Sequence, residues 1–378
     1  MDVLIWFWEY VLPFLVILSV VVFVHEFGHF LVARWNGVRV EVFSIGFGTE
    51  LFGRTDRNGT RWKVCLIPLG GYVKMFGDAD ATSATQEPRE MTPEELAVSF
   101  HGKRVWQRMA IVAAGPLTNF AFAVLVFALM FMTVGQPTTP PVVGEVIPDS
   151  AAAAAGFQVG DRVVSIDGAG IERFTDIQRI VQLSNGRTLT VVVSRGEAPV
   201  TIAVAPRISE TTDNFGNSRR IPLLGLSVSR VEQAMVRHGP LSAVVESVRQ
   251  TYTVVEATLV AVGQMIAGTR GTDELGGPLR IAQFSGQAAQ TGWINFVMFI
   301  AILSVNLGLI NLFPIPMLDG GHLLFYSVEA ARGRPLTERT QEYGLRIGLV
   351  LVFALMVFAT WNDLIQLKVW DFLVGLVS

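Results

Sequence analysis

Two histidines and a glutamate stand at a spacing that can activate water for hydrolysis. His25, Glu26 and His29 form an H-E-x-x-H motif inside a strongly apolar stretch. On a helix, residues four apart lie on one face, so both imidazoles can bind one zinc ion. Glu26 is turned about 100° from His25, where a carboxylate can take a proton from water and return it to a leaving amine. The motif therefore predicts a zinc-dependent hydrolase.

A third zinc ligand must come from elsewhere, because catalytic zinc takes three protein ligands and leaves one position open. Asp319 is the leading candidate, since it ends a long uncharged run in which Pro314 and Pro316 interrupt regular helix. Irregular backbone at membrane depth is tolerated where it is buried or lines a wet cavity. Two alternatives remain, in which Asp319 only caps the helix that follows or His322 is the third ligand instead.

The composition is that of an integral membrane protein. Of 378 residues, 51% are apolar and 16% are charged, against about 25% charged residues in soluble domains. The mean hydropathy of +0.46 agrees, and low charge also excludes a disordered chain. The net charge of −3 gives no basic surface for nucleic acid, and one cysteine, Cys65, excludes an internal disulfide.

Four apolar runs are long enough to cross a membrane. We expect transmembrane helices at 1–34, 109–134, 293–318 and 347–367; the first carries the H-E-x-x-H motif and the third ends in Leu318-Asp319-Gly320. Lys and Arg gather between the first two spans and between the last two, which places both termini outside and the site near the cytoplasmic side. A signal peptide is the alternative for the first run, but it has no basic start or cleavage site.

The polar regions between the spans predict two further structures. Region 35–108 is expected to be cytoplasmic and to hold a β-hairpin, because 61–66 alternates in polarity with period two and 38–43 resembles it. Region 140–207 is expected to be a β-rich domain outside the cytoplasm. Region 208–292 is expected to be a linker that includes an interfacial amphipathic helix at 241–267. A fifth span is the alternative for this helix. Region 319–346 is expected to be a cytoplasmic connection.

These motifs together resemble the site-2 protease family of intramembrane zinc proteases. The matching stretches are His25 to His29, Gly46 to Gly48, Pro68 to Lys74, Gly115 to Phe120, Leu303 to Gly308 and Asn311 to Gly321. The resemblance implies one zinc ion bound by His25, His29 and Asp319, with Glu26 as the general base.

The resemblance also implies residues that contact the substrate. Asn306, Asn311 and Pro316 would line the substrate path, with helix packing and kinking as the alternative. Asn119, one turn after Gly115, is expected to hold the substrate backbone or a group beyond the metal ligands, with ordinary bonding between helices as the alternative.

The stretch from Ser150 to Gly168 resembles a PDZ domain and occurs once. Such a domain binds a chain terminus by strand addition or acts as a steric filter. The expected fold class is therefore a multi-pass α-helical membrane protein with four transmembrane helices, a cytoplasmic membrane-associated β-hairpin region and one extracytoplasmic β-rich PDZ domain.

The implied activity is cleavage of single-span membrane proteins in regulated intramembrane proteolysis, at the cell inner membrane and in a stress response. The substrate class implied is an anti-sigma factor already trimmed outside, together with remnant signal peptides. A transmembrane helix must unwind before hydrolysis, and we expect an exposed edge in the hairpin region 38–76, with Val64–Ile67 along it, to receive the unwound segment by β-augmentation. The alternatives are a PDZ-bearing scaffold or inactive zinc-binding homologue, and a metal transporter, which the charge-free second span disfavours.

Overall fold

The computed structural model describes residues 7–77 and 91–366, without 172, 185, 197, 213–217, 229–233 and 269–275. Two compact units make up the chain. The helical unit comprises Met1–Leu129, Ala243–Val262 and Gly271–Ser378, and the β unit comprises Met130–Ser242 and Gly263–Arg270. Both termini of the chain, and residues 78–90, lie outside the described residues.

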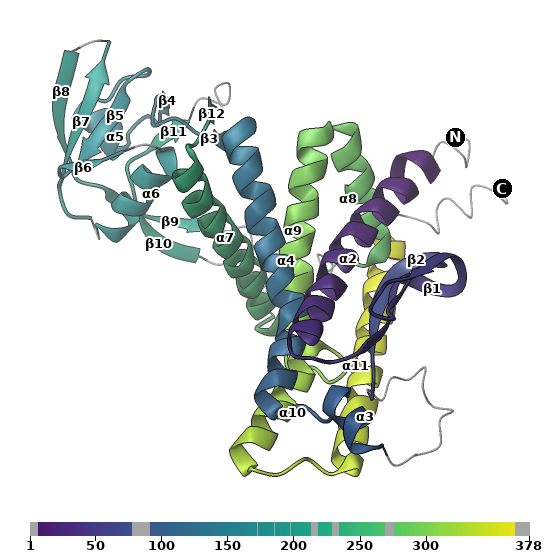
Figure 1. The fold of residues 1–378 in the computed structure, drawn as a ribbon. Helices are drawn as coiled ribbons and strands as arrows, with labels where there is room; N and C mark the ends of the chain where they lie inside the picture. Colours follow the sequence, from purple (N-terminus) through teal and green to yellow (C-terminus); the bar gives the residue numbers. More distant parts are fainter. Residues whose placement is uncertain are drawn as a thin grey trace, which may run out of the picture. The chain divides into compact units, whose positions relative to one another are not determined.

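Among the described residues, four helices are long and apolar enough to cross a membrane, as the sequence predicts. They are Phe7–Trp35, made of the π-helical turn η1 (Phe7–Val11) and α2 (Leu12–Trp35), then α4 (Val105–Thr133), α9 (Trp293–Asn311) and Arg339–Ile365 within α11 (Glu338–Gln366). Within the helical unit, α2 and α9 run in one direction and α4 and α11 in the other (Figure 1). This alternation is what successive crossings of one bilayer require.

The third span is shorter than the expected 293–318. Helix α9 ends at Asn311, because Pro314 and Pro316 cannot donate the backbone hydrogen bonds that would continue it. The chain turns irregularly through 312–318, where Met317 has a φ of +87°. Helix α10 (Asp319–Arg332) then begins with Asp319 as its first helical residue and Leu318 as its N-cap, so the N-cap role considered for Asp319 is wrong.

The region after α2 forms two long antiparallel strands, β1 (Val40–Thr55) and β2 (Arg61–Met75), which lie beside α2 (Figure 1). Strand β1 bends, so that its first half pairs with both ends of β2. Val64 consequently lies between Ile45 and Phe52 and is an interior position. The segment Gly71–Met75 pairs only with β1 among the described residues. One edge of this sheet therefore lies at 71–75, inside the hairpin region 38–76 where an edge is expected, and the expectation that Val64–Ile67 runs along an edge is wrong at Val64.

Three more helices complete the helical unit: α3 (Pro93–Val98), α7 (Pro240–Ile266, shared with the β unit) and α8 (Pro278–Gln290). Helix α7 covers the expected amphipathic helix, and it is not among the candidate spans found in the described residues; its place at a membrane interface stays a prediction. The buried carboxylate of Asp363 accepts hydrogen bonds from the backbone N–H groups of Gly277, Leu279 and Arg280, at 2.8, 3.0 and 3.1 Å. This bond set ties the start of α8 to α11.

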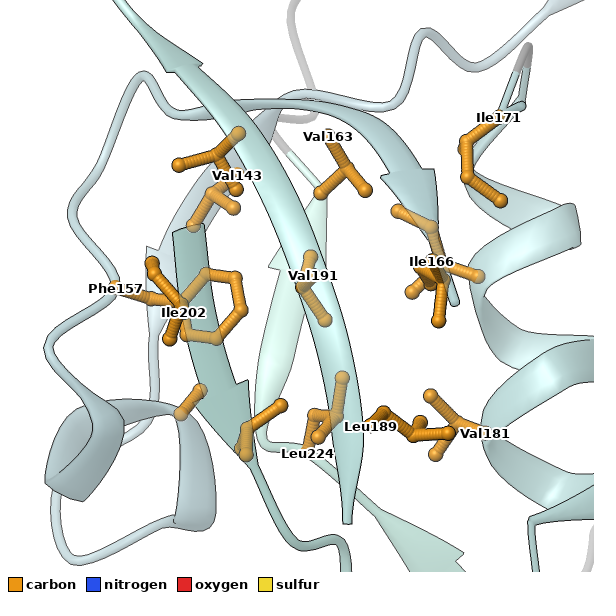
Figure 2. Close-up of a cluster of buried hydrophobic side chains, with 14 of the residues drawn as sticks. Val143, Phe157, Val163, Ile166, Ile171, Val181, Leu189, Val191, Ile202 and Leu224 are labelled. Atoms are coloured by element: carbon orange, nitrogen blue, oxygen red, sulfur yellow. The ribbon is translucent and has the colours of Figure 1, made fainter. Parts of the chain in front are cut away.

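The β unit is built on a four-stranded antiparallel sheet in the order β6-β5-β7-β8. Its elements are β3 (Gln136–Thr138), β4 (Val143–Val146), α5 (Ala151–Ala155), β5 (Arg162–Ile166), β6 (Ala169–Gly170), α6 (Phe174–Leu183), β7 (Leu189–Arg195), β8 (Ala198–Val204), β9 (Arg207–Thr212), β10 (Ser218–Leu223), β11 (Leu226–Val228) and β12 (Ala234–Val236). Alternate residues Leu189, Val191 and Val193 of β7 belong to the core, and Figure 2 shows Leu189 and Val191 pointing into it.

The β unit extends beyond the expected boundaries of 140–207. Strand β9 pairs with β10, β11 returns to pair with β4, and β12 pairs with β3. Leu224, inside the stretch expected to be a linker, is 5% exposed and belongs to the core. These returning strands follow the expected end of the domain at 207.

Candidate active site

The two histidines of the H-E-x-x-H motif lie together on one face of α2. His25 and His29 are buried, at 7% and 8% exposed, and their Nε2 atoms are 3.3 Å apart. This is the arrangement that a spacing of four residues in a helix predicts.

Asp319, from the start of α10, meets both imidazoles. Its Oδ2 lies 3.1 Å from His25 Nε2 and 3.6 Å from His29 Nε2. With 3.3 Å between the two Nε2 atoms, these three atoms form a nearly equilateral ligand triangle. Zinc ligands at 2.0–2.1 Å in tetrahedral geometry are separated by about 3.3 Å. The residues therefore fit a zinc ion, by both their geometry and their chemistry.

The alternative ligand His322 is not part of this triangle. Its ring packs against Phe325 and Tyr326, with ring centroids 6.4 Å away in each case. Within the described ranges, the residues whose ligand atoms converge for a metal are His25, His29 and Asp319.

One face of α4 supports the ligand triangle from behind. His29 Nδ1 lies 2.9 Å from the Ile111 carbonyl oxygen, and Asn119 Nδ2 lies 3.2 Å from His25 Nδ1. Between them, a Cβ at Gly115 would come within 2.9 Å of His25 Cε1, so only glycine leaves room for the ring. A Cβ at Gly28 would lie 2.5 Å from the Ala114 carbonyl oxygen. Gly28 thus serves the close packing of α2 on α4.

A cavity of about 440 Å³ opens beside the ligand triangle. Glu26 lines it together with the three candidate ligands, so its carboxylate belongs to the same space as the expected metal. The remaining lining residues are Val22, Phe47, Leu69, Gly70, Gly71, Tyr72, Val73, Leu307, Asn311, Met317 and Leu318.

Of the expected substrate residues, the structure brings only Asn311 to this cavity. Asn311 Nδ2 lies 3.4 Å from His25 Nε2. Asn306 instead contacts α7, where Thr258 Oγ1 is 2.9 Å from its Oδ1. Pro316 lies against α11, since a Cβ at Gly348 would come within 2.5 Å of its carbonyl carbon. Asn119 is fully buried and does not line the cavity.

Sequence reasoning missed the strand that forms one wall of the cavity. Residues 69–73 of β2 line it, and the edge of the sheet begins within this stretch. The Gly70-Gly71 pair after an alternating run was the available signal. A glycine is required at 71, because a Cβ there would lie 2.7 Å from the Ser44 carbonyl oxygen.

Comparison with known proteins places this site in a family. The profile of peptidase family M50 matches residues 13–355. The chain belongs to peptidase family M50. This is the site-2 protease family that the motifs resemble, and its members are zinc metalloproteases.

Individual relatives of this M50 peptidase match it over nearly its whole length. A candidate zinc metalloprotease of Agrobacterium fabrum is 47% identical, over 95% of this chain and 96% of its own. One from Rhizobium meliloti is 46% identical, over 94% and 96%. The regulator of sigma-E protease RseP of Escherichia coli is 33% identical, over 94% and 98%.

Among solved structures, the PDZ domain of an SdrC-like protein from Listeria monocytogenes aligns with the M50 peptidase. The alignment covers 25% of this chain and 90% of the Listeria domain, with 18% identity and a TM-score of 0.20. So slight a likeness decides nothing about the β unit. Its assignment as a PDZ domain stays a prediction.

Proposed function

We propose that the protein is an intramembrane endopeptidase that uses one zinc ion to cleave the transmembrane segments of single-span proteins. The observation that carries the proposal is the ligand triangle of His25, His29 and Asp319, whose ligand atoms lie within 4.8 Å of one another. Glu26 lines the cavity beside it. A scaffold has no use for a carboxylate at this position, whereas a hydrolase requires a base there.

Each residue of the site has a separate role in the proposed reaction. Bound zinc would polarise the scissile carbonyl and make water nucleophilic near neutral pH. Glu26 takes the proton from the attacking water and passes it to the leaving amine. The amide of Asn311, at the cavity wall, donates a hydrogen bond to a polar group of the substrate.

Strand β2 provides the means of holding an unwound substrate. A transmembrane helix satisfies its own backbone groups, so its scissile carbonyl is reachable only after local unwinding. The edge at Gly71–Met75 pairs on one side only with described strands, and its first residues line the cavity. A substrate segment added at this edge regains its backbone hydrogen bonds next to Glu26.

The proposed location is the cell inner membrane, with both termini in the periplasm. The start of α10 and the arginine-containing connection 332–346 follow the same end of the third span. Under the positive-inside rule this end is cytoplasmic, which puts the ligand triangle near the cytoplasmic side. The proposed substrates are anti-sigma factors after trimming outside the membrane, and remnant signal peptides. The β unit, as a PDZ domain, would bind chain termini or exclude untrimmed substrates by size.

Co-expression with a trimmed single-span reporter tests this function. The wild type should cleave the reporter, and Glu26→Gln should bind zinc but leave the reporter intact. Equal cleavage by both proteins would rule out the proposed mechanism. An intact reporter with both proteins, together with its capture by both, would instead favour the scaffold.

A further inference from the structure

Three residues of α4, one turn apart, face the two imidazoles. The Ile111 carbonyl contacts His29, Gly115 leaves room for both rings, and Asn119 contacts His25. Residues at positions i, i+4 and i+8 lie along one stripe of a helix. A single face of α4 thus meets the ring nitrogens that point away from the ligand triangle.

For His29, the hydrogen-bond partner decides which ring nitrogen carries the proton. A backbone carbonyl can only accept a hydrogen bond, so His29 Nδ1, 2.9 Å from the Ile111 oxygen, carries the hydrogen. A neutral imidazole has one N–H, which leaves the Nε2 lone pair facing the ligand triangle. This is how a partner beyond the metal ligands fixes the tautomer that binds zinc.

His25 Nδ1 likewise needs a hydrogen-bond acceptor, and Asn119 is the side chain beside it. His25 can offer Nε2 to zinc as a neutral ring only if Nδ1 carries the hydrogen and finds an acceptor. Asn119 Nδ2 lies 3.2 Å from that nitrogen, while Asn119 Oδ1 is buried without a hydrogen-bond partner among the described residues. A half-turn of the amide exchanges two atoms of nearly equal size and brings Oδ1 to Nδ1.

We propose that Asn119 is a positioning residue for the zinc site: its Oδ1 accepts the hydrogen bond of His25 Nδ1–H and thereby holds Nε2 toward the metal. The inference rests on the proposed function, in which His25 is a ligand. It replaces the expected contact with substrate, because Asn119 is 0% exposed. The packing of α4 on α9 uses a different atom, since the Asn119 backbone oxygen accepts from Ser304 Oγ at 3.0 Å.

Zinc affinity of the purified full-length protein, measured by competition with a chelator, tests the assignment. Asn119→Leu keeps the approximate shape but removes the acceptor, and should weaken zinc binding by about 10- to 100-fold. Asn119→Asp retains an acceptor and loses the donor, so it should bind zinc close to the wild-type level. Ser304→Ala removes only the packing bond and should leave zinc affinity unchanged.

Each other outcome overturns the inference. If Asn119→Asp binds zinc as poorly as Asn119→Leu, the amide acts through its donor. If Asn119→Leu binds like the wild type, or Ser304→Ala weakens binding equally, the side chain serves packing alone. In these cases the wild type still binds zinc and the proposed function stands. A wild type that binds no zinc contradicts the proposed function as well.

Discussion

Arg108 of α4 and Glu329 of α10 form a buried ion pair, with Nη2 2.5 Å from Oε1 and side chains 11% and 6% exposed. The guanidinium also lies over the ring of Tyr326, at 4.7 Å from its centroid. Helix α4 supports the two histidines, and α10 begins with Asp319. The ion pair therefore fixes the helix that carries the third ligand against the helix that orients the first two.

Breaking this pair should loosen the ligand triangle. Glu329→Gln leaves a buried guanidinium without its charge partner, and should lower the free energy of unfolding by about 3–5 kcal/mol and weaken zinc binding. The matched control is Glu342→Gln in the exposed pair with Arg346, whose side chains are 60% and 69% exposed; it should change stability by less than about 1 kcal/mol. Thermal unfolding and zinc affinity in detergent measure both effects. Equal behaviour of the two variants would contradict the role of the buried pair.

The close approach of β2 to α2 makes Gly71 sensitive to a single methyl group. A Cβ at Gly71 would lie 2.7 Å from the Ser44 carbonyl oxygen, 3.1 Å from Val22 Cγ1 and 3.4 Å from Glu26 Cγ. Gly71→Ala should move the strand away from α2 and lower turnover by about 10²-fold, the effect of a misplacement near 1 Å. Zinc content should remain, because no ligand is touched. Gly263→Ala, in open space on α7, should leave turnover unchanged, and a reporter assay with zinc analysis compares them.

The parts of the site that the sequence predicts are those with a local signal. His25, Glu26 and His29 follow from helical spacing alone. Asp319 follows because carboxylates are rare in apolar surroundings, and the prolines at 314 and 316 predict the irregular backbone before it. The proposed ligand set thus depends on short motifs, although its members are almost 300 residues apart.

The remaining features depend on contacts that leave no local pattern. The Ile111 carbonyl beside His29 is a backbone group, so no side chain marks it. The edge at 71–75 exists because β1 bends and pairs twice, which alternation of polarity does not reveal. The return of β11 to β4 likewise joins segments distant in sequence, and for this reason the sequence predicts too early an end for the β unit.

The β unit should lose stability in acid through Asp161. Asp161 is 1% exposed and accepts two hydrogen bonds from Arg195, each 2.8 Å long. The two bonds from Arg195, with a third from the Gln158 N–H, hold the pKa of Asp161 below its ordinary value of 3.8. The ionised form thus stabilises the fold above pH 3.8, and this contribution is lost as pH falls toward the lower folded pKa.

Asp161→Asn isolates this contribution. At neutral pH the variant should be less stable by about 1.5–3 kcal/mol, the value of a hydrogen bond to a charged group. Hydrogen exchange of β5 and β7 in the full chain measures the difference in stability between the variant and the wild type. The two proteins are compared at the same pH, so the pH dependence of the intrinsic exchange rate cancels. The difference should shrink between about pH 5 and about pH 3. A difference that is constant across this range would exclude Asp161 as the titrating group.

Helix α7 contacts Asn306, which is predicted to line the substrate path. Thr258 Oγ1 lies 2.9 Å from Asn306 Oδ1 and also 2.9 Å from the Val254 carbonyl oxygen. If Asn306 lines the substrate path, as the family resemblance implies, Thr258 competes for its Oδ1 with any N–H group that an unwound segment donates to it. Its strength, about 1 kcal/mol for a neutral hydrogen bond, then opposes substrate binding.

Thr258→Val keeps the shape of the side chain and removes the contact, so it should raise kcat/KM on a single-span reporter by about fivefold, the equivalent of 1 kcal/mol. The matched control is Thr253→Val, since the exposed Thr253 bonds only to the Arg249 carbonyl within its own helix among the described contacts. The gain should appear as a lower KM. It should vanish in an Asn306→Leu background, because that background has no Asn306 amide for the loss of Thr258 to free. A gain that persists in that background would assign the effect to α7 packing, and a lower kcat/KM for Thr258→Val would mean that the contact assists catalysis.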